Sequence, residues 1–339
     1  MDAPSMHFFS DKTALAAAVL TRRQSLLALG LLPLSVQAQS LWPSRPLRLI
    51  VPYPSGGISD TVARWLAQRL APVLGQSVVV DNKPGASGVL GMDALAKSLP
   101  DGHTLAFSAI SPLTLLPHLG KTPYDPTQDI APVISIMSSP VLLLATPSCP
   151  ARDLKELLQW ARSRPSSVRW STSGSASLGH VVLEQIRRQA QVDITHVPYK
   201  GGGQQITDAL AGHVEVLSVN AGPAVLAHIK QNQLRALAVG APSRMDSLPQ
   251  VPTLAEAGFE AANLSSVFGV FAPARTPAPV IERLHQELSR LLSQTELRTR
   301  LLQTDNIPTG GTSAQFAQQL SHESQLNARI IQWAHIRAD

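Results

Sequence analysis

Residues 47–57 read LRLIVPYPSGG, an apolar strand pattern at 47–51 followed by a loop rich in proline and glycine at 52–57. Directly after this loop, Ser59 or Asp60 can cap a helix. The apolar residues of that helix recur at helical spacing, namely Val62, Trp65, Leu66, Leu70, Val73 and Leu74. A strand, a tight loop and an amphipathic helix in this order begin a βαβ unit, so the stretch predicts an α/β fold with mostly parallel sheets.

The same alternation of strands and helices continues along the chain. A first series places strands at 78–80, 104–108, 133–137 and 141–145, with the last two as adjacent strands, and a helix that ends at 99. A second series places strands at 168–172, 194–197, 214–219 and 234–240, and helices at 153–163, 180–190 and 204–211. The strand at 267–272 and the helices at 278–292 and 313–333 have no sheet of their own to cover, so we expect them to return to the first series.

This organisation predicts two α/β lobes with a ligand cleft between them. Lobe 1 comprises residues 43–145 and 269–339, and lobe 2 comprises residues 146–268. In α/β folds, ligands bind beyond the carboxyl ends of the strands, where loops from both lobes would meet.

Composition excludes several classes of protein. The 339 residues are 44% hydrophobic and 15% charged, which is not the composition of a disordered chain. The net charge is +5, but Lys and Arg are scattered, with no run longer than the pairs Arg22-Arg23 and Arg187-Arg188. Because aromatic residues make up only 4%, we expect no nucleic-acid partner. A lone cysteine, Cys149, excludes an internal disulfide and a CxxC redox pair.

Residues 1–38 have the layout of a cleaved export signal. Arg22-Arg23 precede the apolar segment 26–36, and Val36-Gln37-Ala38 places small residues at a cleavage site. We therefore expect cleavage near Ala38 and export across the inner membrane. The string TRRQSLL at 21–27 also resembles a twin-arginine signal, so the general secretory route and the twin-arginine route both stay open.

Three loops that precede helices are candidate anion sites, at 52–58, 173–179 and 200–203. The first N–H groups of a helix have no partner within the helix, and the helix dipole adds positive potential there. Glycines let the main chain approach a carboxylate or phosphate, and the serines of 171–177 add hydroxyl donors. His180 is the histidine that we place at the cleft; the alternative is a side chain bonded to the neighbouring loop. Asp60 is more typical of a cap that shapes the first loop.

Motifs for catalysis, cofactors or metals are near misses. Residues 85–91 read GxxGxxG instead of the dinucleotide pattern GxGxxG, and residues 174–179 miss GxSxG by one position. There is no HExxH, and His180, His196, His213 and His228 lack metal-ligand spacing. We predict no catalytic residue, no cofactor and no metal.

Several motifs together resemble a known family. They are LIVPYPSGG at 49–57 with Asp60, VVDNKPGA at 79–86, PDG at 100–102, HVPYKG at 196–201, VPT at 251–253 with Glu256 and Gly258, and FAPA at 271–274 with Thr276-Pro277. In this order they resemble the Bug family, the periplasmic substrate-binding proteins of tripartite tricarboxylate transporters. The resemblance implies a two-lobed fold like that of type II periplasmic binding proteins, a small carboxylate ligand, inner-membrane permease subunits as partners and a periplasmic location. We expect a monomer.

The resemblance also implies which residues would hold the ligand. They are Pro54, Ser55, Gly56, Gly57 and Ile58, supported by Asp60, in the first loop, and Ser173, Gly174, Ser175, Ala176 and Ser177, with His180, in the second. To these we add Tyr53 and, from the third loop, Gly201 and Lys200, with Lys200 at the edge of the cleft. This chain departs from the family pattern at Ala176, where glycine is frequent, and at Ser111-Pro112, where asparagine-proline is common. Two rival functions remain open from the residues alone, an exported α/β enzyme that uses the same cleft and a carboxylate sensor for a signalling partner.

Overall fold

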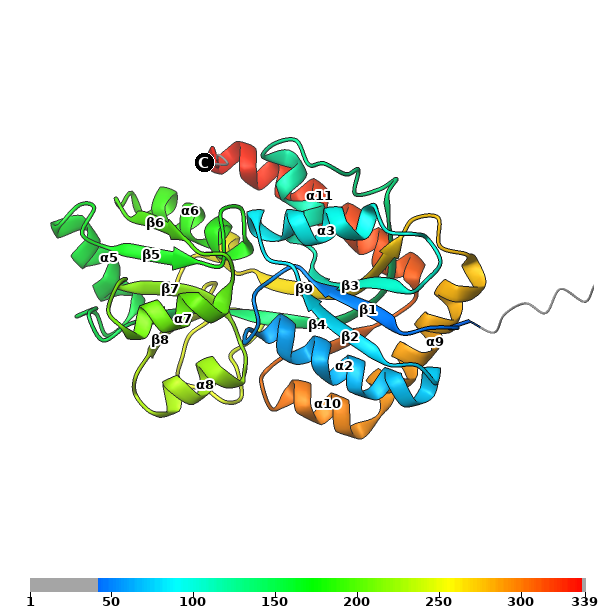
Figure 1. Ribbon diagram of the computed structural model, residues 1–339. Coiled ribbons are helices and arrows are strands. Elements are labelled where there is room, and N and C mark those ends of the chain that lie inside the picture. Colours follow the sequence, from blue (N-terminus) through cyan, green and yellow to red (C-terminus); the bar gives the residue numbers. More distant parts are fainter. Residues whose placement is uncertain (1–41, 337–339) are drawn as a thin grey trace, which may run out of the picture. The chain divides into compact units, whose positions relative to one another are not determined.

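The computed structural model describes residues 42–336, and the predicted export signal lies outside them (Figure 1). Within these residues, no helix combines the length and the apolar character needed to cross a membrane.

The first sheet contains the N-terminal strands and strands that return from the end of the chain. Its strands are β1 (Leu47–Val51), β2 (Val78–Asn82), β3 (Thr104–Ala109), β9 (Ser265–Pro273), most of β4 (Ile130–Ala145) and β10 (Ile307–Gly310). Their order is β2-β1-β3-β9-β4, with β10 also paired to β4. Leu47, Leu49 and Val51 of β1 belong to one hydrophobic cluster and Ile50 to another, so both faces of the sheet are buried.

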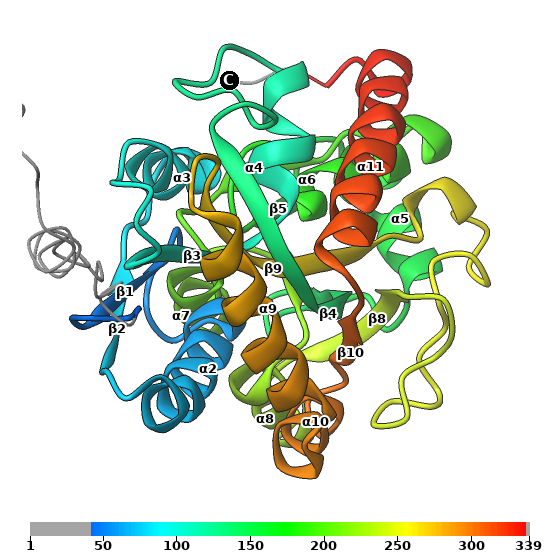
Figure 2. The ribbon, with the colours of Figure 1, turned by 90° about the vertical axis from the view of Figure 1, so that its right-hand side faces the viewer.

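Helices cover both faces of this sheet (Figures 1 and 2). One cluster includes residues from α2 (Ile58–Leu74), α9 (Ala278–Ser293) and α10 (Thr295–Leu302). The other includes residues from α3 (Val89–Ala96), α4 (Ser111–Thr114) and α11 (Ser313–Ala334). The 3-10 turns η1 (Ala86–Gly88) and η2 (Leu116–His118) flank α3 and α4 in sequence.

The second sheet contains the middle of the chain. It comprises β8 (Arg235–Gly240), the end of β4, β7 (Val216–Asn220), β5 (Arg169–Thr172) and β6 (Thr195–Pro198). Helices α5 (Leu154–Ser163) and α6 (Leu178–Ala190) contribute to one hydrophobic cluster, and α7 (Gly202–Leu210) and α8 (Pro223–Lys230) to another. The turn η3 (Glu260–Ala262) leads into β9.

Strand β4 joins the two sheets and corrects one prediction. The two strands expected at 133–137 and 141–145 are one strand of 16 residues, Ile130–Ala145. Pro140 does not end it, because its position stays extended and pairs with Ser265 of β9, and its carbonyl accepts a hydrogen bond from Ala221 N at 3.0 Å. Residues before this point pair with β9, and Val141 to Ala145 pair with β7 and β8.

The expectation of mostly parallel sheets is also wrong. Among the strands of residues 42–336, β1 pairs in parallel with β2 and β3, and β5 with β6 and β7. The pairings β3–β9, β4–β7, β4–β8, β4–β9 and β4–β10 are antiparallel. The βαβ units are parallel as predicted, whereas β4 and β9 run in opposite directions between the sheets and make the connecting region antiparallel. The predicted lobe boundaries stay a prediction.

Helices α4, α8 and α10 and strand β10 were not predicted. Each is short, with at most eight residues, so its sequence carries too few turns of a periodic pattern to reveal it.

Candidate functional site

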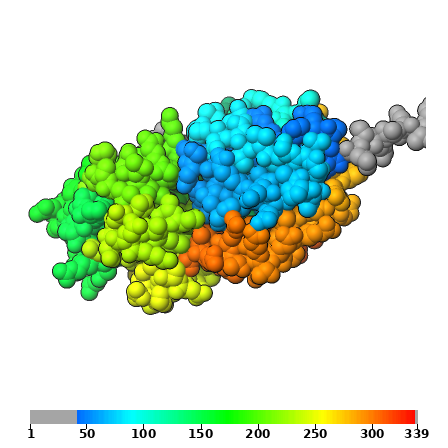
Figure 3. All heavy atoms as spheres, turned by 60° about the horizontal axis from the view of Figure 1, so that its bottom comes forward, coloured from blue at the N-terminus to red at the C-terminus, as the bar shows by residue number. Residues whose placement is uncertain are grey.

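A cavity lies where loops of the first sheet meet loops of the second. Its volume is about 910 Å³, including space that is open to solvent. The first-sheet side contributes Tyr53, Pro54, Gly56, Gly57, Ile58, Ser59, Ser87, Ala109, Ser111, Ser266 and Phe268. The second-sheet side contributes Val141, Ser173, Ser177, Leu178, Gly179, Gly202, Ile206, Ser218, Val219, Asn220, Gly222, Pro223, Ala224 and Val225. On the surface, the blue segment that includes α2 meets green segments of the second sheet (Figure 3).

The first loop of the site, between β1 and α2, is held by a buried carboxylate. Asp60 is 5% exposed, and its side chain accepts hydrogen bonds from Gly56 N at 3.1 Å, Arg64 Nε at 3.1 Å and Asn82 Nδ2 at 3.0 Å. Burial alone would raise the pKa of Asp60, but the hydrogen bonds from Arg64, Gly56 and Asn82 hold this pKa below its usual value. Asp60 therefore stays ionised and fixes the loop from behind, where Gly56 takes a φ of 87°.

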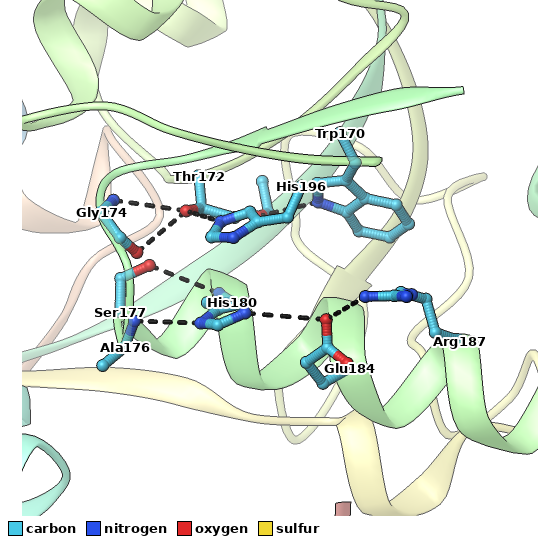
Figure 4. Close-up of polar contacts among 10 residues, drawn as sticks. Trp170, Thr172, Gly174, Ala176, Ser177, His180, Glu184, Arg187 and His196 are labelled. Carbon is cyan, nitrogen blue, oxygen red and sulfur yellow. Dashed lines mark hydrogen bonds and ion pairs between the residues drawn. The ribbon is translucent and has the colours of Figure 1, made fainter. Parts of the chain in front are cut away.

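The second loop, between β5 and α6, is shaped by the start of its helix (Figure 4). Ser177 Oγ accepts a hydrogen bond from His180 N at 3.3 Å, which is the N-cap bond of α6. His180 Nδ1 accepts a hydrogen bond from Ala176 N at 3.0 Å. This leaves Nε2 as the donor atom of the ring, and it lies 3.6 Å from Glu184 Oε1. Ala176 takes a φ of 60°, in the left-handed region that favours glycine.

A second histidine supports the same loop. The rings of His180 and His196 stack with their centroids 4.0 Å apart and an angle of 7° between their planes. His196 Nε2 lies 2.8 Å from Thr172 Oγ1, which in turn donates to Gly174 O at 2.9 Å. Burial, with a smaller contribution from the neighbouring His180, lowers the pKa of His196 to about 4, so His196 is neutral at pH 7.

Glycines allow the two sides of the cavity to approach closely. An added Cβ on Gly201 would lie 2.5 Å from Pro54 Cδ, and one on Gly203 would lie 2.9 Å from Ser55 O. Ser87 Oγ donates a hydrogen bond to Ser175 O. The structure therefore shows the loops of the two sheets in direct contact around the cavity.

The residues predicted from the sequence divide into two groups. Tyr53, Pro54, Gly56, Gly57, Ile58, Ser173 and Ser177 line the cavity. Ser55, Asp60, Gly174, Ser175, Ala176, His180, Lys200 and Gly201 are not among its lining residues. Asp60 and His180 form hydrogen bonds with the backbone of the loops, and Lys200 is exposed.

Sequence reasoning missed much of the cavity wall. The strands β4, β7 and β9 contribute Val141, Ser218, Val219, Asn220, Ser266 and Phe268, and the start of α8 contributes Gly222, Pro223, Ala224 and Val225. Gly202, which also lines the cavity, belongs to the predicted loop at 200–203. The glycine-proline pair at 222–223 marks the start of α8 and was an available signal. The residues of the strands look like ordinary core residues in the sequence.

Metal-ligand groups do not occur in the described part of the chain: no three His, Cys, Asp or Glu residues of 42–336 lie together as a metal site would require. Cys149 is a buried free thiol, and burial raises its pKa, which disfavours the thiolate.

Comparisons with known proteins agree on one family. Residues 62–336 match the model of the tripartite tricarboxylate transporter family receptor. The chain is 37% identical over 256 residues to protein BugT of Bordetella pertussis, covering 74% of this chain and 77% of BugT. Its fold is similar to that of R. palustris Rpa4515, solved with adipate, at 32% identity and a TM-score of 0.83, covering 87% of this chain and 99% of that one. It is also similar to MatC of Rhodopseudomonas palustris, solved with bound malate, at 29% identity and a TM-score of 0.81, covering 86% of this chain and 100% of MatC.

Proposed function

The chain belongs to the tripartite tricarboxylate transporter receptor family, and from this premise we propose that it captures a small organic carboxylate in the cavity and delivers it to inner-membrane permease subunits. Membership confirms the resemblance and the α/β binding-protein fold predicted from the sequence. It also confirms the prediction of a receptor instead of an enzyme, since the family is a binding-protein family.

One observation carries the ligand class. The starts of α2 and α6 both contribute to the cavity, through Gly57 to Ser59 and through Ser177 to Gly179. Unpaired N–H groups and the helix dipoles at these starts favour a negative charge, and the hydroxyls of Ser173 and Ser177 add donors. Relatives with this fold were solved with adipate and with malate, which supports a carboxylate here.

The mechanism that we propose is closure of the two predicted lobes on the ligand. The donors come from both sheets, so a carboxylate reaches all of them only when the loops approach as they do in this structure. Binding then shifts the population towards the closed form. Small-angle scattering should show a smaller radius of gyration with saturating ligand, and an unchanged profile would contradict this mechanism.

The test of the function is a thermal-shift screen of residues 39–339 followed by calorimetry, with malate, adipate, hexanoate and benzoate as the panel. A ligand that binds only the folded state raises the melting temperature by mass action. Gly57→Val should weaken binding of the best acid, because Gly57 lines the cavity with no atom closer than 4.0 Å to an added Cβ, and the larger side chain fills that space. Gly120→Val is the matched control, since nothing lies within 4 Å of its added Cβ.

We also propose a periplasmic location and delivery of the ligand to a permease, and the same family membership supports both. Mass spectrometry of a periplasmic fraction should find a chain that begins near Gln39. A chain that keeps Met1 and stays in the cytoplasm would refute the location and the delivery step together.

A further inference from the structure

The turn between β2 and α3 has an unusual backbone. Its residues Gly85, Ala86, Ser87 and Gly88 take φ angles of 141°, 45°, 54° and 101°. Positive φ is unfavourable for residues with a Cβ, so Ala86 and Ser87 keep these conformations only because the surrounding structure fixes them. Residues of this kind gather at functional sites, and Ser87 lines the cavity.

This turn is fixed to the first-sheet side of the cavity. An added Cβ on Gly88 would lie 2.8 Å from Pro112 Cγ, and one on Gly91 would lie 2.5 Å from Pro52 Cβ. Pro52 follows β1 and Pro112 follows β3, so the turn packs against the loops at the carboxyl ends of both strands. The position of Ser87 is therefore set by the first sheet.

Ser87 reaches across to the second loop of the site. Its Oγ donates a hydrogen bond to Ser175 O. An added Cβ on Gly174 would overlap Ser87 Oγ, so Gly174 allows this close approach. Ser175 lies in the chain between Ser173 and Ser177, which both line the cavity. The Ser87–Ser175 bond therefore joins the two sides at the cavity itself.

The proton of Ser87 is already used in this bond. A serine hydroxyl has one O–H donor, and its remaining lone pairs only accept hydrogen bonds. An ionised carboxylate also has only acceptor oxygens, so Ser87 has no hydrogen bond to give a carboxylate while it bonds to Ser175 O. Ser87 therefore lines the cavity without serving as a donor to the ligand.

The location of the Ser87–Ser175 bond makes it sensitive to closure. By comparison, Asn220 Nδ2 donates to Pro140 O at 3.4 Å beside β4, the strand that joins the sheets. A movement of one sheet relative to the other would change this contact little, because β7 is paired with β4 there. Ser87 and Ser175 lie on turns of opposite sheets, so they would separate and bond to water instead. The Ser87–Ser175 bond would then stabilise only the closed form.

We propose that Ser87 is a positioning residue that holds the cavity closed through Ser175 O and does not donate a hydrogen bond to the ligand. Its bond raises the population of the closed form, and it does so by the same factor whichever acid is bound. This inference rests on the proposed function, since it assumes closure on a carboxylate, and it adds a residue that determines how strongly the closed form is favoured.

Ser87→Ala tests the bond by calorimetry on residues 39–339, with each acid of the panel that binds the natural protein. A hydrogen bond between neutral groups usually changes an equilibrium about 2- to 13-fold. We expect the dissociation constant to rise by a factor in this range, and by the same factor for every acid, because closure is common to all of them. Stopped-flow measurements should place the rise in the dissociation rate, because the bond forms only after capture.

Two further variants separate the bond from other effects of the substitution. Ser87→Gly also removes the hydroxyl but suits the φ of 54°, so it should lose as much affinity as Ser87→Ala and melt at the same or a higher temperature. Ser98→Ala is the matched control. Ser98 Oγ donates to Ala94 O at 2.6 Å within the first-sheet side, so this variant also loses a serine-to-carbonyl bond and should keep the natural affinity.

The outcomes separate this inference from the proposed function. Natural affinity in Ser87→Ala or in Ser87→Gly, an equal loss of affinity in Ser98→Ala, or factors that differ clearly between acids would overturn the role of Ser87 while the carboxylate receptor stands. If no acid of the panel binds the natural protein, the proposed function is refuted and this inference with it.

Discussion

Gly203→Ala should weaken ligand binding without weakening the fold. Gly203 is the second residue of α7 and has an ordinary φ, so alanine causes no backbone strain there. Alanine in place of glycine usually stabilises a helix by about 0.5–1 kcal/mol. Its Cβ, however, would lie 2.9 Å from Ser55 O, a backbone atom of the loop that follows β1. The substitution therefore acts on the contact between the two sides of the cavity.

The size of the effect follows from that contact. A Cβ needs about 3.4 Å from an oxygen atom, so the loops must separate by a few tenths of an ångström, and neither partner is a flexible side chain. Overpacking of this kind costs roughly 1–3 kcal/mol. If that cost falls on the closed arrangement alone, the dissociation constant rises about 5- to 140-fold.

Calorimetry with the tightest-binding acid of the panel, and thermal melting without ligand, measure the two effects separately. Gly120→Ala is the control, because an added Cβ there meets no atom within 4 Å. Unchanged affinity for Gly203→Ala would refute the reasoning, since the ligand would then bind without the close approach of Gly203 and Ser55.

Three further predictions concern stability. The folded pKa of His196, about 4, lies below its unfolded value of 6.5, so its contribution to stability is complete above about pH 6.5 and is lost as pH falls towards 4. With allowance for partial exposure, the stability lost is about 2 kcal/mol. In urea unfolding, the fall in stability from pH 7 to pH 4.5 should be smaller for His196→Gln than for the natural protein. Asp60→Asn should destabilise the protein by about 1–3 kcal/mol, because it removes an ionised acceptor shared by Gly56 N and Arg64. The contribution of Asp60 is present above its unfolded pKa of 3.8 and is lost below it, so the unfolding free energies of the variant and the natural protein should become equal in acid. Gly269→Ala should cost about 1–3 kcal/mol in urea unfolding, because its Cβ would overlap the buried ring of Phe316; a loss below 0.5 kcal/mol would mean that the ring moves freely.

Local elements were predictable from the sequence where periodicity was strong. The strand expected at 47–51 is β1, Leu47–Val51, and the helices expected at 153–163 and 278–292 are α5 and α9 within one residue. Each has several apolar residues at a regular spacing, so local pattern and tertiary burial agree. Strand direction was not predictable for β4 and β9, because it depends on which distant strand each one pairs with.

The site was predictable in its loops and not in the residues that β4, β7 and β9 contribute to the cavity. Glycines and serines after a strand stand out in a sequence, and seven of the predicted residues line the cavity. Val141, Val219 and Phe268 are apolar strand residues that the sequence does not distinguish from core residues. They line the cavity because β4 pairs with β7 and β9, and this pairing is visible only in the folded structure. For His180 the sequence left two roles open, and the structure shows the bond from Ala176 N to its ring.

The strands that join the two sheets also line the cavity. Val141 lies on β4, and Ser266 and Phe268 lie on β9, next to the pair formed by Pro140 and Ser265. A movement of one sheet relative to the other would bend the chain near that pair, so these residues would keep their place while the loops move. The starts of α2 and α6 line the cavity from opposite sheets, so under the proposed mechanism a carboxylate gains the donors of both only on closure.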